Sequence, residues 1–238
     1  MRNFKFAFWG GLALLAVLWF VADPTVFHPA TFWALRSAMV QFTGVIAIAS
    51  MSLAMGLALR PRWPETWLGG LDKMYRLHKW LGIAALVASV LHWLWAKAPK
   101  WAVGWGWLER PERGPRAPDT NLIESFLRGI HGFAEDIGEW AFYAAVVLIA
   151  LALIKYFPYR WFYKTHRLLA LAYLILVFHT VVLFQFSYWI SPIGGLIALL
   201  LAAGTWAAVV VLRRRVGADR KVPGQIMALR YFPGVHAL

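Results

Sequence analysis

Four histidines on two apolar stretches form two matched pairs along the chain. His78 and His92 lie fourteen residues apart, and His166 and His179 lie thirteen apart. At a helical rise of about 1.5 Å per residue, each spacing separates its two imidazoles by roughly 20 Å. Neutral imidazole is a good ligand for haem iron, and a histidine on each face gives a six-coordinate iron suited to electron transfer. The pattern therefore predicts two stacked haem groups that would carry electrons across a membrane.

The two spacings differ in how well they fit an ideal helix. A helix turns about 100° per residue, so fourteen residues bring His92 back to within about 40° of His78. Thirteen residues miss this alignment by far more. The helix with His166 and His179 would therefore need a local change of winding, a bend, or two ring orientations suited to differently rotated haems.

Each histidine taken alone has a simpler explanation. A single histidine in a membrane span is often only a hydrogen-bonded polar group. Ionisable groups are costly inside a membrane and are functional there by default, so four in two matched pairs favour ligation. The other three, His28, His131 and His236, are better explained as solvated or interfacial residues. His131 has the alternative of approaching the edge of an outer haem.

Composition assigns the chain to the integral membrane proteins. It is 61% hydrophobic and 15% charged, with a mean hydropathy of +0.59, as expected for a membrane protein. The absence of cysteine excludes disulfides, thiolate metal sites and iron–sulfur clusters. The net charge of +13 comes from basic residues at helix ends. We therefore expect contact with acidic membrane lipid and no nucleic-acid partner.

Six apolar segments are each close to the roughly 20 residues that a spanning helix needs. The first follows a basic start, as in a signal peptide, but no A-x-A-like site follows it, so we interpret it as a retained span. We predict an all-α membrane protein with a six-transmembrane-helix bundle over residues 1–212 and two stacked b haems. The approximate bounds are Phe6–Val21, Phe32–Leu59, Tyr75–Ala96, Trp140–Phe157, Lys164–Phe186 and Ile193–Leu212.

Charge predicts the orientation of this bundle. With a cytoplasmic N-terminus, one side carries Arg2, Lys5, Arg60, Arg62, Lys73, Arg76, Arg160, Lys164 and Arg213–Arg215. The other side carries most of the acidic residues: Asp23, Glu109, Glu112, Asp119, Glu124, Glu135, Asp136 and Glu139. The positive-inside rule then favours a multi-pass protein of a bacterial-type cytoplasmic membrane with both termini cytoplasmic. The stretch ESFLRGIHGFAEDIGEW is expected to form a short interfacial helix on the external side.

Six spans make the third and fifth helices parallel. Equal depth then pairs His78 with His166 on the cytoplasmic side and His92 with His179 on the external side.

Both histidine motifs resemble the haem-bearing spans of ferric reductases and NADPH oxidases. In LHKWLGIAALVASVLHW, a His-Lys at the inner end of the third helix precedes a second histidine fourteen residues later. In FYKTHRLLALAYLILVFHT, an aromatic-rich lead precedes a histidine and then another thirteen residues on. The resemblance covers roughly residues 1–212. It implies that His78 and His166 ligate an inner haem b, and that His92 and His179 ligate an outer one.

Further residues enter through the same resemblance. Arg36, in FWALRSAMVQFTG, resembles the family's arginine beside the outer haem, where its charge would pair with a propionate or stabilise superoxide. The alternative is an interfacial arginine that snorkels outward. Ala96 stands where family oxidases often carry a further histidine, which favours generic outward electron delivery over superoxide production. Tyr173 lies near the level of the aromatic that bridges the haems in several relatives, although Ala172 holds the corresponding register.

Basic residues near the inner pair have two explanations of equal weight. These residues are Arg76, Lys79, Lys164 and Arg167. They would bind haem propionates or a flavin phosphate, or they are only the charges that flank a cytoplasmic helix end.

Relatives of this family draw electrons from a cytoplasmic FAD and NAD(P)H module after the sixth helix. Residues 213–238 form a basic tail in which QIMALRYF has the alternation of a β-strand. We interpret this tail as the truncated start of an FAD-binding domain, the alternative being a stand-alone subunit served by a separate reductase. FAD and NAD(P)H are implied by the family and would be bound outside this chain.

The leading expectation is an oxidoreductase of the NAD(P)H oxidase or ferric reductase type. Electrons from a cytoplasmic reduced flavin or NAD(P)H would reach oxygen, giving superoxide, or a ferric chelate outside. The alternative is a haem membrane subunit that delivers electrons to a periplasmic methionine sulfoxide reductase. Such subunits are short and lack the flavin module, but they usually lack one of the four histidines present here. A transporter or structural bundle is less favoured because no broken helices occur in corresponding halves.

Overall fold

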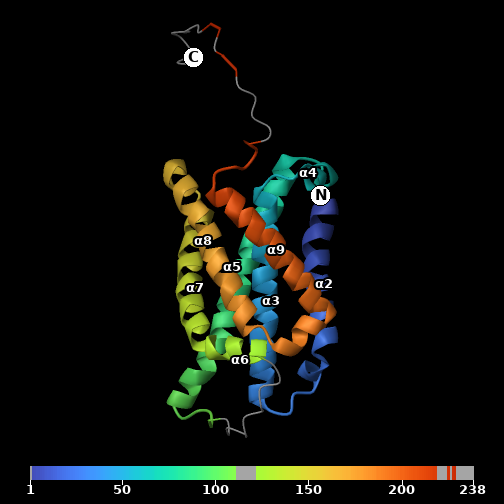
Figure 1. The fold of residues 1–238 in the computed structure, drawn as a ribbon, viewed down its shortest axis with the longest axis vertical. Helices are drawn as coiled ribbons and strands as arrows, with labels where there is room; N and C mark the ends of the chain where they lie inside the picture. The colour runs from blue at the N-terminus through green and yellow to red at the C-terminus, as the bar shows by residue number, and fades with distance from the viewer. Residues whose placement is uncertain (1, 111–121, 219–223, 226, 229–238) are drawn as a thin grey trace.

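The computed structural model describes residues 2–110, 122–218, 224–225 and 227–228, and this part of the chain is a bundle of long helices (Figure 1). Six of its helical rods are long and apolar enough to cross a membrane. They are Arg2–Ala22, α3 (Phe32–Ala58), α5 (Leu71–Gly104), α7 (His131–Leu153), α8 (Tyr159–Leu183) and α9 (Pro192–Leu212). The first rod joins α1 (Arg2–Lys5), η1 (Phe6–Gly10) and α2 (Gly11–Ala22). The predicted all-α architecture with six candidate spans is confirmed.

Short helices occur in the connections, and local sequence explains several of the boundaries. They are η2 (Pro24–Phe27), α4 (Arg62–Leu68), α6 (Leu122–Gly129) and η3 (Phe186–Ile190). The Thr31 side chain caps α3 by accepting from the Ala34 amide at 3.1 Å. Gly69 and Gly70, with φ of +83° and +131°, make the turn between α4 and α5 in a backbone region that favours glycine. Pro192 opens α9, where no backbone donor is needed.

Close packing of small residues places α3 against several other rods. α3 contacts α5, α9, α8 and α2, while α7 packs mainly on α8. The buried residues of α3 include Ala47, Ala49, Ser50 and Ala54, and small side chains of this kind let helix backbones approach closely in membranes. In Figure 1, α9 crosses obliquely between α8 and α2, and α7 and α8 lie side by side.

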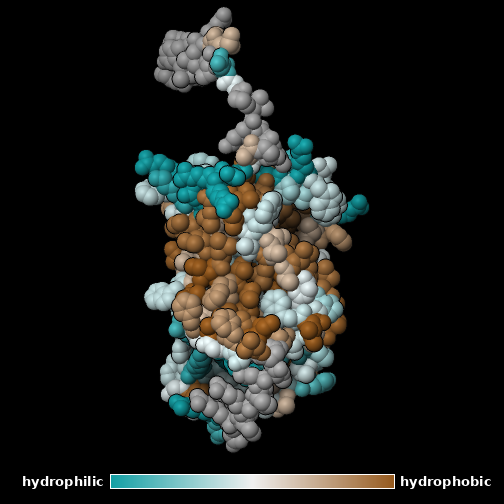
Figure 2. Space-filling view, in the orientation of Figure 1, coloured by the Kyte–Doolittle hydropathy of each residue, from teal (hydrophilic) through white to brown (hydrophobic). Residues whose placement is uncertain are grey.

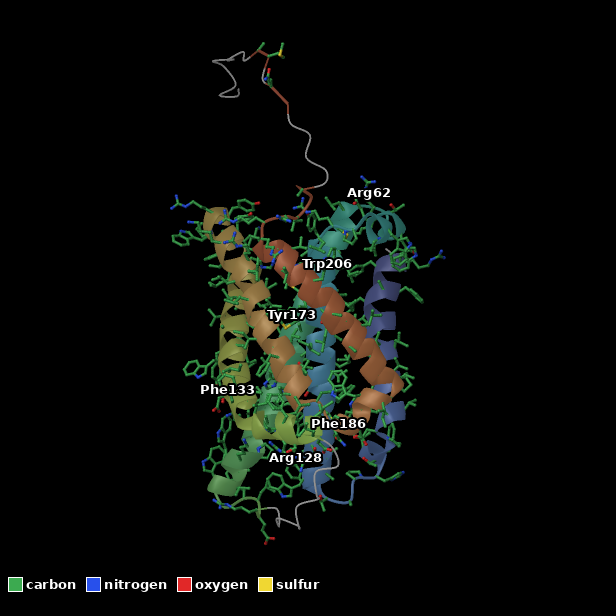
Figure 3. The ribbon with its side chains drawn as sticks, viewed as in Figure 1. Arg62, Arg128, Phe133, Tyr173, Phe186 and Trp206 are labelled. Atoms are coloured by element: carbon green, nitrogen blue, oxygen red, sulfur yellow. The ribbon has the colours of Figure 1, made fainter. Side chains whose placement is uncertain are left out.

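Tyr173 lies inside this packed core. Its side chain is fully buried, and its hydroxyl is 2.8 Å from Oγ of Ser52 on α3. Figure 3 places Tyr173 near the middle of the bundle.

Several predicted boundaries were wrong. The third helix is 34 residues long, or about 51 Å, and extends past a hydrocarbon core of about 30 Å. The fourth ends at Leu153 rather than at Phe157, before the turn at residues 154–158. The stretch expected to form one interfacial helix is divided between α6 and the first turns of α7. The strand expected in QIMALRYF (225–232) lies largely outside the described residues, as does His236.

The surface of the bundle is apolar between its two ends (Figure 2). Figure 2 shows a broad hydrophobic band on the visible face between two hydrophilic ends. The N-terminus and the end of α9 lie at one end of the bundle, while α6 lies at the other (Figure 1). Because α4 precedes α5 and the turn after α7 precedes α8 at that first end, α5 and α8 run in the same direction. The parallel third and fifth spans are therefore confirmed.

Candidate redox-cofactor site

The structure brings the four histidines together in two pairs, matched as depth along the helices predicts. His78 on α5 faces His166 on α8, with ring centroids 5.8 Å apart and ring planes at 64°. Further along the same helices, the centroids of His92 and His179 are 6.3 Å apart, with ring planes at 82°. α8 is an uninterrupted α-helix from Tyr159 to Leu183, so the thirteen-residue spacing does not break it.

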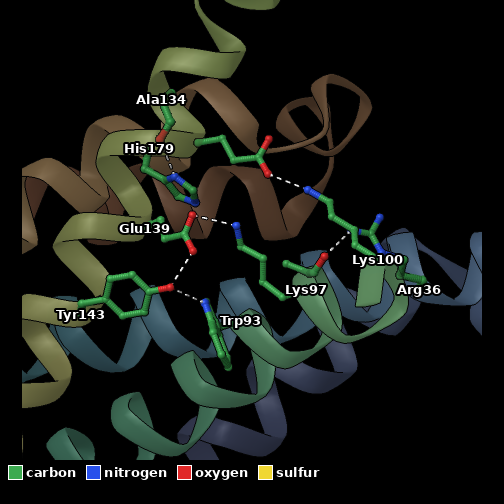
Figure 4. A network of polar contacts seen from close by, with 10 residues as sticks. Arg36, Trp93, Lys97, Lys100, Ala134, Glu139, Tyr143 and His179 are labelled. Atoms are coloured by element: carbon green, nitrogen blue, oxygen red, sulfur yellow. Dashed lines mark hydrogen bonds and ion pairs between the residues drawn. The ribbon is translucent and has the colours of Figure 1, made fainter. Parts of the chain in front are cut away.

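Backbone carbonyls of neighbouring helices hold three of the four rings. Nδ1 of His78 lies 2.9 Å from the Ala54 carbonyl oxygen on α3. Nδ1 of His92 lies 2.8 Å from that of Val40, also on α3. Nδ1 of His179 lies 2.8 Å from that of Ala134 on α7 (Figure 4). Because a carbonyl oxygen can only accept, each Nδ1 carries the proton and each Nε2 keeps its lone pair.

His166 is held differently. Its ring stacks on Phe162, with centroids 4.9 Å apart and planes at 15°. Its Nδ1 is buried and has no hydrogen-bond partner among the described residues. The fourth imidazole is therefore oriented by an aromatic neighbour on its own helix rather than by a carbonyl.

A cavity of about 390 Å³ lies beside the second pair, between α3, α5, α7 and α8. His92 and His179 both line it. Apolar side chains cover the wall toward the middle of the bundle: Ile48, Met51, Leu86, Ile149 and Leu176. Polar side chains gather toward the end that carries α6: Arg36, Lys97, Lys100, His131, Glu135 and Glu139. The cavity has an apolar interior and a charged mouth.

The two pairs fit a haem better than a bare metal ion. Imidazole nitrogen binds metals such as zinc at about 2 Å, so two rings on opposite sides of one metal have centroids roughly 6 Å apart. The observed separations, 5.8 Å and 6.3 Å, agree with this value. No group of three or more His, Cys, Asp or Glu side chains suited to a metal ion occurs among the described residues. A metal here would have to bring its remaining ligands with it, as iron does in a porphyrin.

Arg36 lies at the cavity mouth. Its Nη2 donates to the Ala96 carbonyl oxygen at 2.9 Å, and its Nε is buried without a partner among the described residues. The side chain is thus directed across to Ala96 on α5. This placement does not match an arginine that simply snorkels outward.

Sequence reasoning missed an ion-pair network beside the second histidine pair. Lys97 Nζ lies 2.7 Å from Glu139 Oε2, and Lys100 Nζ lies 3.1 Å from Glu135 Oε1. The Tyr143 hydroxyl donates to Glu139 at 2.7 Å, and Trp93 Nε1 lies 3.3 Å from that hydroxyl (Figure 4). The sequence contains a signal for this network. Two lysines lie three residues apart on α5 and two glutamates lie four residues apart on α7, so each pair shares one helix face.

The remaining predicted residues lie in different places. His131 lines the cavity, and His28 is exposed at the end of η2. Tyr173 is buried in the core and does not line the cavity. The basic residues expected near the inner pair are exposed or half-buried at the end of the bundle that carries α4: Arg76, Lys79, Lys164 and Arg167.

Comparison with known proteins gives one family. A family model described as "Ferric reductase like transmembrane component" matches residues 43–177, more than half of the chain. The matched region includes His78, His92 and His166 with the carbonyl partners Ala54 and Ala134, while Val40 and His179 lie just outside it. No curated protein matches the chain.

Proposed function

Since this chain belongs to the ferric reductase-like transmembrane family, we propose that it moves electrons from a cytoplasmic reduced flavin or NAD(P)H donor to oxygen or ferric iron outside. Two haem b groups would be held by His78 with His166 and by His92 with His179. The family itself indicates a membrane oxidoreductase that transfers electrons across the bilayer. The donor, the acceptor and the haem arrangement are our proposal.

The observation that carries the proposal is the pairing of the rings at two depths. Each pair joins α5 and α8 with a ring separation suited to one intervening metal. When bound, a haem ligated by two histidines supplies a six-coordinate iron that changes oxidation state by one electron. Roughly 20 Å along the helices separates the two levels, so together they extend across much of an apolar core about 30 Å thick.

The protein's own contribution is orientation and burial. Carbonyl oxygens of Ala54, Val40 and Ala134 fix three imidazoles with Nε2 free to ligate. Such contacts also raise the basicity of a ligating imidazole. The apolar wall beside the second pair keeps water away from that level, and burial of this kind sets reduction potentials.

Arg36 is the proposed catalytic residue at the external end. The lysines and glutamates at the mouth are paired with one another, which leaves the guanidinium as the unbalanced cation among the described side chains that line the mouth. It would attract an anionic ferric chelate or stabilise developing superoxide. Ala96 supplies a carbonyl to Arg36 instead of an imidazole to oxygen, which favours a general acceptor site.

The donor would meet the opposite end. Basic residues surround the helix ends nearest His78 and His166, and they would attract the phosphates of a flavin or the acidic face of a reductase. We propose that residues 1–212 are the haem domain and that residues 213–238 begin or contact the flavin-binding partner. Basic residues at the end that carries the start of the first rod and the end of α9 favour a cytoplasmic position for that end, in a bacterial-type cytoplasmic membrane.

The test is haem stoichiometry in matched histidine variants. We expect two haem b per wild-type chain by pyridine haemochrome, with two redox transitions in a potentiometric titration. His92→Leu should lose one haem and one transition and keep the other. His131→Leu is the control, because that histidine lines the same cavity but lies outside both pairs. A colourless wild-type protein from cells with ample haem precursor, or unchanged haem content in His92→Leu, would refute the proposal.

A further inference from the structure

We propose that Gly44 and Gly138 are positioning residues whose missing side chains let His92 and His179 reach a backbone carbonyl and present Nε2 to the outer haem. The inference rests on the proposed haem ligation, and it assigns a role to two residues on helices that carry no ligand themselves.

The closest approach is at His179. Its Nδ1 donates to the Ala134 carbonyl oxygen on α7 at 2.8 Å, and Gly138 stands four residues further along the same helix. A Cβ at Gly138 would overlap Nδ1 of His179 and lie 2.6 Å from its Cγ. Real Cβ atoms do not come so close to a ring, so any side chain at residue 138 would displace the imidazole.

The same arrangement recurs at His92 with more room. Its Nδ1 donates to the Val40 carbonyl oxygen on α3 at 2.8 Å, and Gly44 again stands four residues further along. A Cβ at Gly44 would lie 3.1 Å from Nδ1 and 3.2 Å from Cε1 of His92. These distances are tight but need only a shift of a few tenths of an ångström.

Helix geometry explains the four-residue relation. In an α-helix the carbonyl of residue i already accepts from the amide of residue i+4. A ring that shares this carbonyl must therefore lie over residue i+4, where a side chain would occupy its place. Glycine opens that space, as small residues do wherever elements in a membrane approach closely. At the inner pair the carbonyl of Ala54 is followed four residues later by Ala58, so a small residue stands there too.

The functional consequence lies in the ligand atom. A ring that donates from Nδ1 must present Nε2, and it becomes a more basic ligand through that hydrogen bond. Without the hydrogen bond from Nδ1, the less basic imidazole would stabilise ferric iron less than ferrous iron. The reduction potential of the outer haem would therefore rise. The inner haem would be unaffected, because neither glycine lies near His78 or His166 among the contacts of a built Cβ.

The two glycines predict a graded experiment. Gly138→Ala should lose the outer haem and its redox transition, whereas Gly44→Ala should keep it with an upward-shifted potential and altered low-spin EPR g-values. The controls are Gly132→Ala on α7 and Gly56→Ala on α3, where an added Cβ meets no described atom within 4 Å outside its own helix segment. Both controls should keep two haems with unchanged potentials. An unchanged outer haem in both Gly138→Ala and Gly44→Ala would overturn the inference.

A double-mutant cycle separates this inference from the proposed function. If the added methyl group clashes with the imidazole, Gly138→Ala should lower the unfolding temperature far more in wild type than in a His179→Ala background. This coupling is measurable whether or not haem is bound. A wild type without haem would refute the proposed function, while equal losses of stability in the two backgrounds would refute the role of Gly138.

Discussion

Ser52 and Tyr173 share a buried hydrogen bond, and we predict that removing one hydroxyl lowers the free energy of unfolding more than removing the other. The Ser52 hydroxyl donates to the Ile48 carbonyl oxygen at 2.8 Å, which uses its single proton. The 2.8 Å contact with Tyr173 must therefore be donated by the tyrosine. Both residues are almost completely buried, so whichever polar group loses its partner has no access to water.

The magnitudes follow from what each substitution leaves behind. Ser52→Ala removes the acceptor and leaves the Tyr173 O–H buried without a partner, which should cost about 1–3 kcal/mol. Tyr173→Phe removes a donor but leaves Ser52 bonded to Ile48, and average hydrogen bonds between membrane helices contribute about 0.6 kcal/mol. We therefore expect Ser52→Ala to destabilise the protein more than Tyr173→Phe. The double variant should be more stable than Ser52→Ala alone, because no buried donor remains.

The assay is reversible unfolding in mixed detergent micelles, followed by tryptophan fluorescence for wild type, both single variants and the double variant. Ser89→Ala on α5 is a suitable control, because that hydroxyl donates to the Ala85 carbonyl oxygen of its own helix at 2.6 Å. The reasoning would be refuted if Tyr173→Phe cost as much as Ser52→Ala. Electron transfer gives a second readout: a large loss of rate in a stable, haem-replete Tyr173→Phe protein would show that the residue relays electrons.

Two other predictions concern the external end. Arg36→Ala should leave haem content unchanged but raise the KM for an anionic ferric chelate roughly tenfold. This matches the loss of one charge-assisted contact of about 1.5 kcal/mol. Equal effects on anionic and neutral acceptors in steady-state assays would argue against this role. Burial raises the pKa of Tyr188 above its ordinary value, and its hydroxyl donates to Asp23. The folded state thus holds this proton more tightly, so the contribution to stability is complete at neutral pH and declines as pH rises past about 10. Tyr188→Phe should remove that alkaline loss in pH-dependent unfolding curves, and identical curves for the two proteins would contradict it.

The parts of the structure that were predictable are those encoded by residue type at a fixed spacing. Six apolar runs separated by turn residues predicted the spans, and the depth of His78, His92, His166 and His179 predicted the pairs that the structure brings together. The ends of the helices were less predictable. α5 continues to Gly104 through Pro99, although its last residues lie beyond the apolar run that defined the predicted span.

Other features depend on which faces of two helices meet. Lys97 and Glu139 are ordinary external charges in the sequence, and their ion pair exists only because α5 and α7 place those faces together. On a single ideal helix, the thirteen-residue spacing turns His166 and His179 in different directions. In the bundle, His179 is turned toward α7 by Ala134 while His166 lies against Phe162, so the two rings on α8 have different neighbours.

The carbonyls that hold the histidines are invisible to any analysis of side chains, since every residue has one. What the sequence can reveal is the residue that must be absent beside the carbonyl. Gly44 and Gly138 are unfavourable inside helices by about 1 kcal/mol relative to alanine, and nothing in the local pattern of α3 or α7 requires them. This loss of stability is explained by the rings of His92 and His179, which occupy the space that a side chain at residue 44 or 138 would take. At Gly44 and Gly138 the missing side chain thus marks a ring arriving from another helix, and the residue four positions earlier, Val40 or Ala134, supplies the carbonyl that receives it.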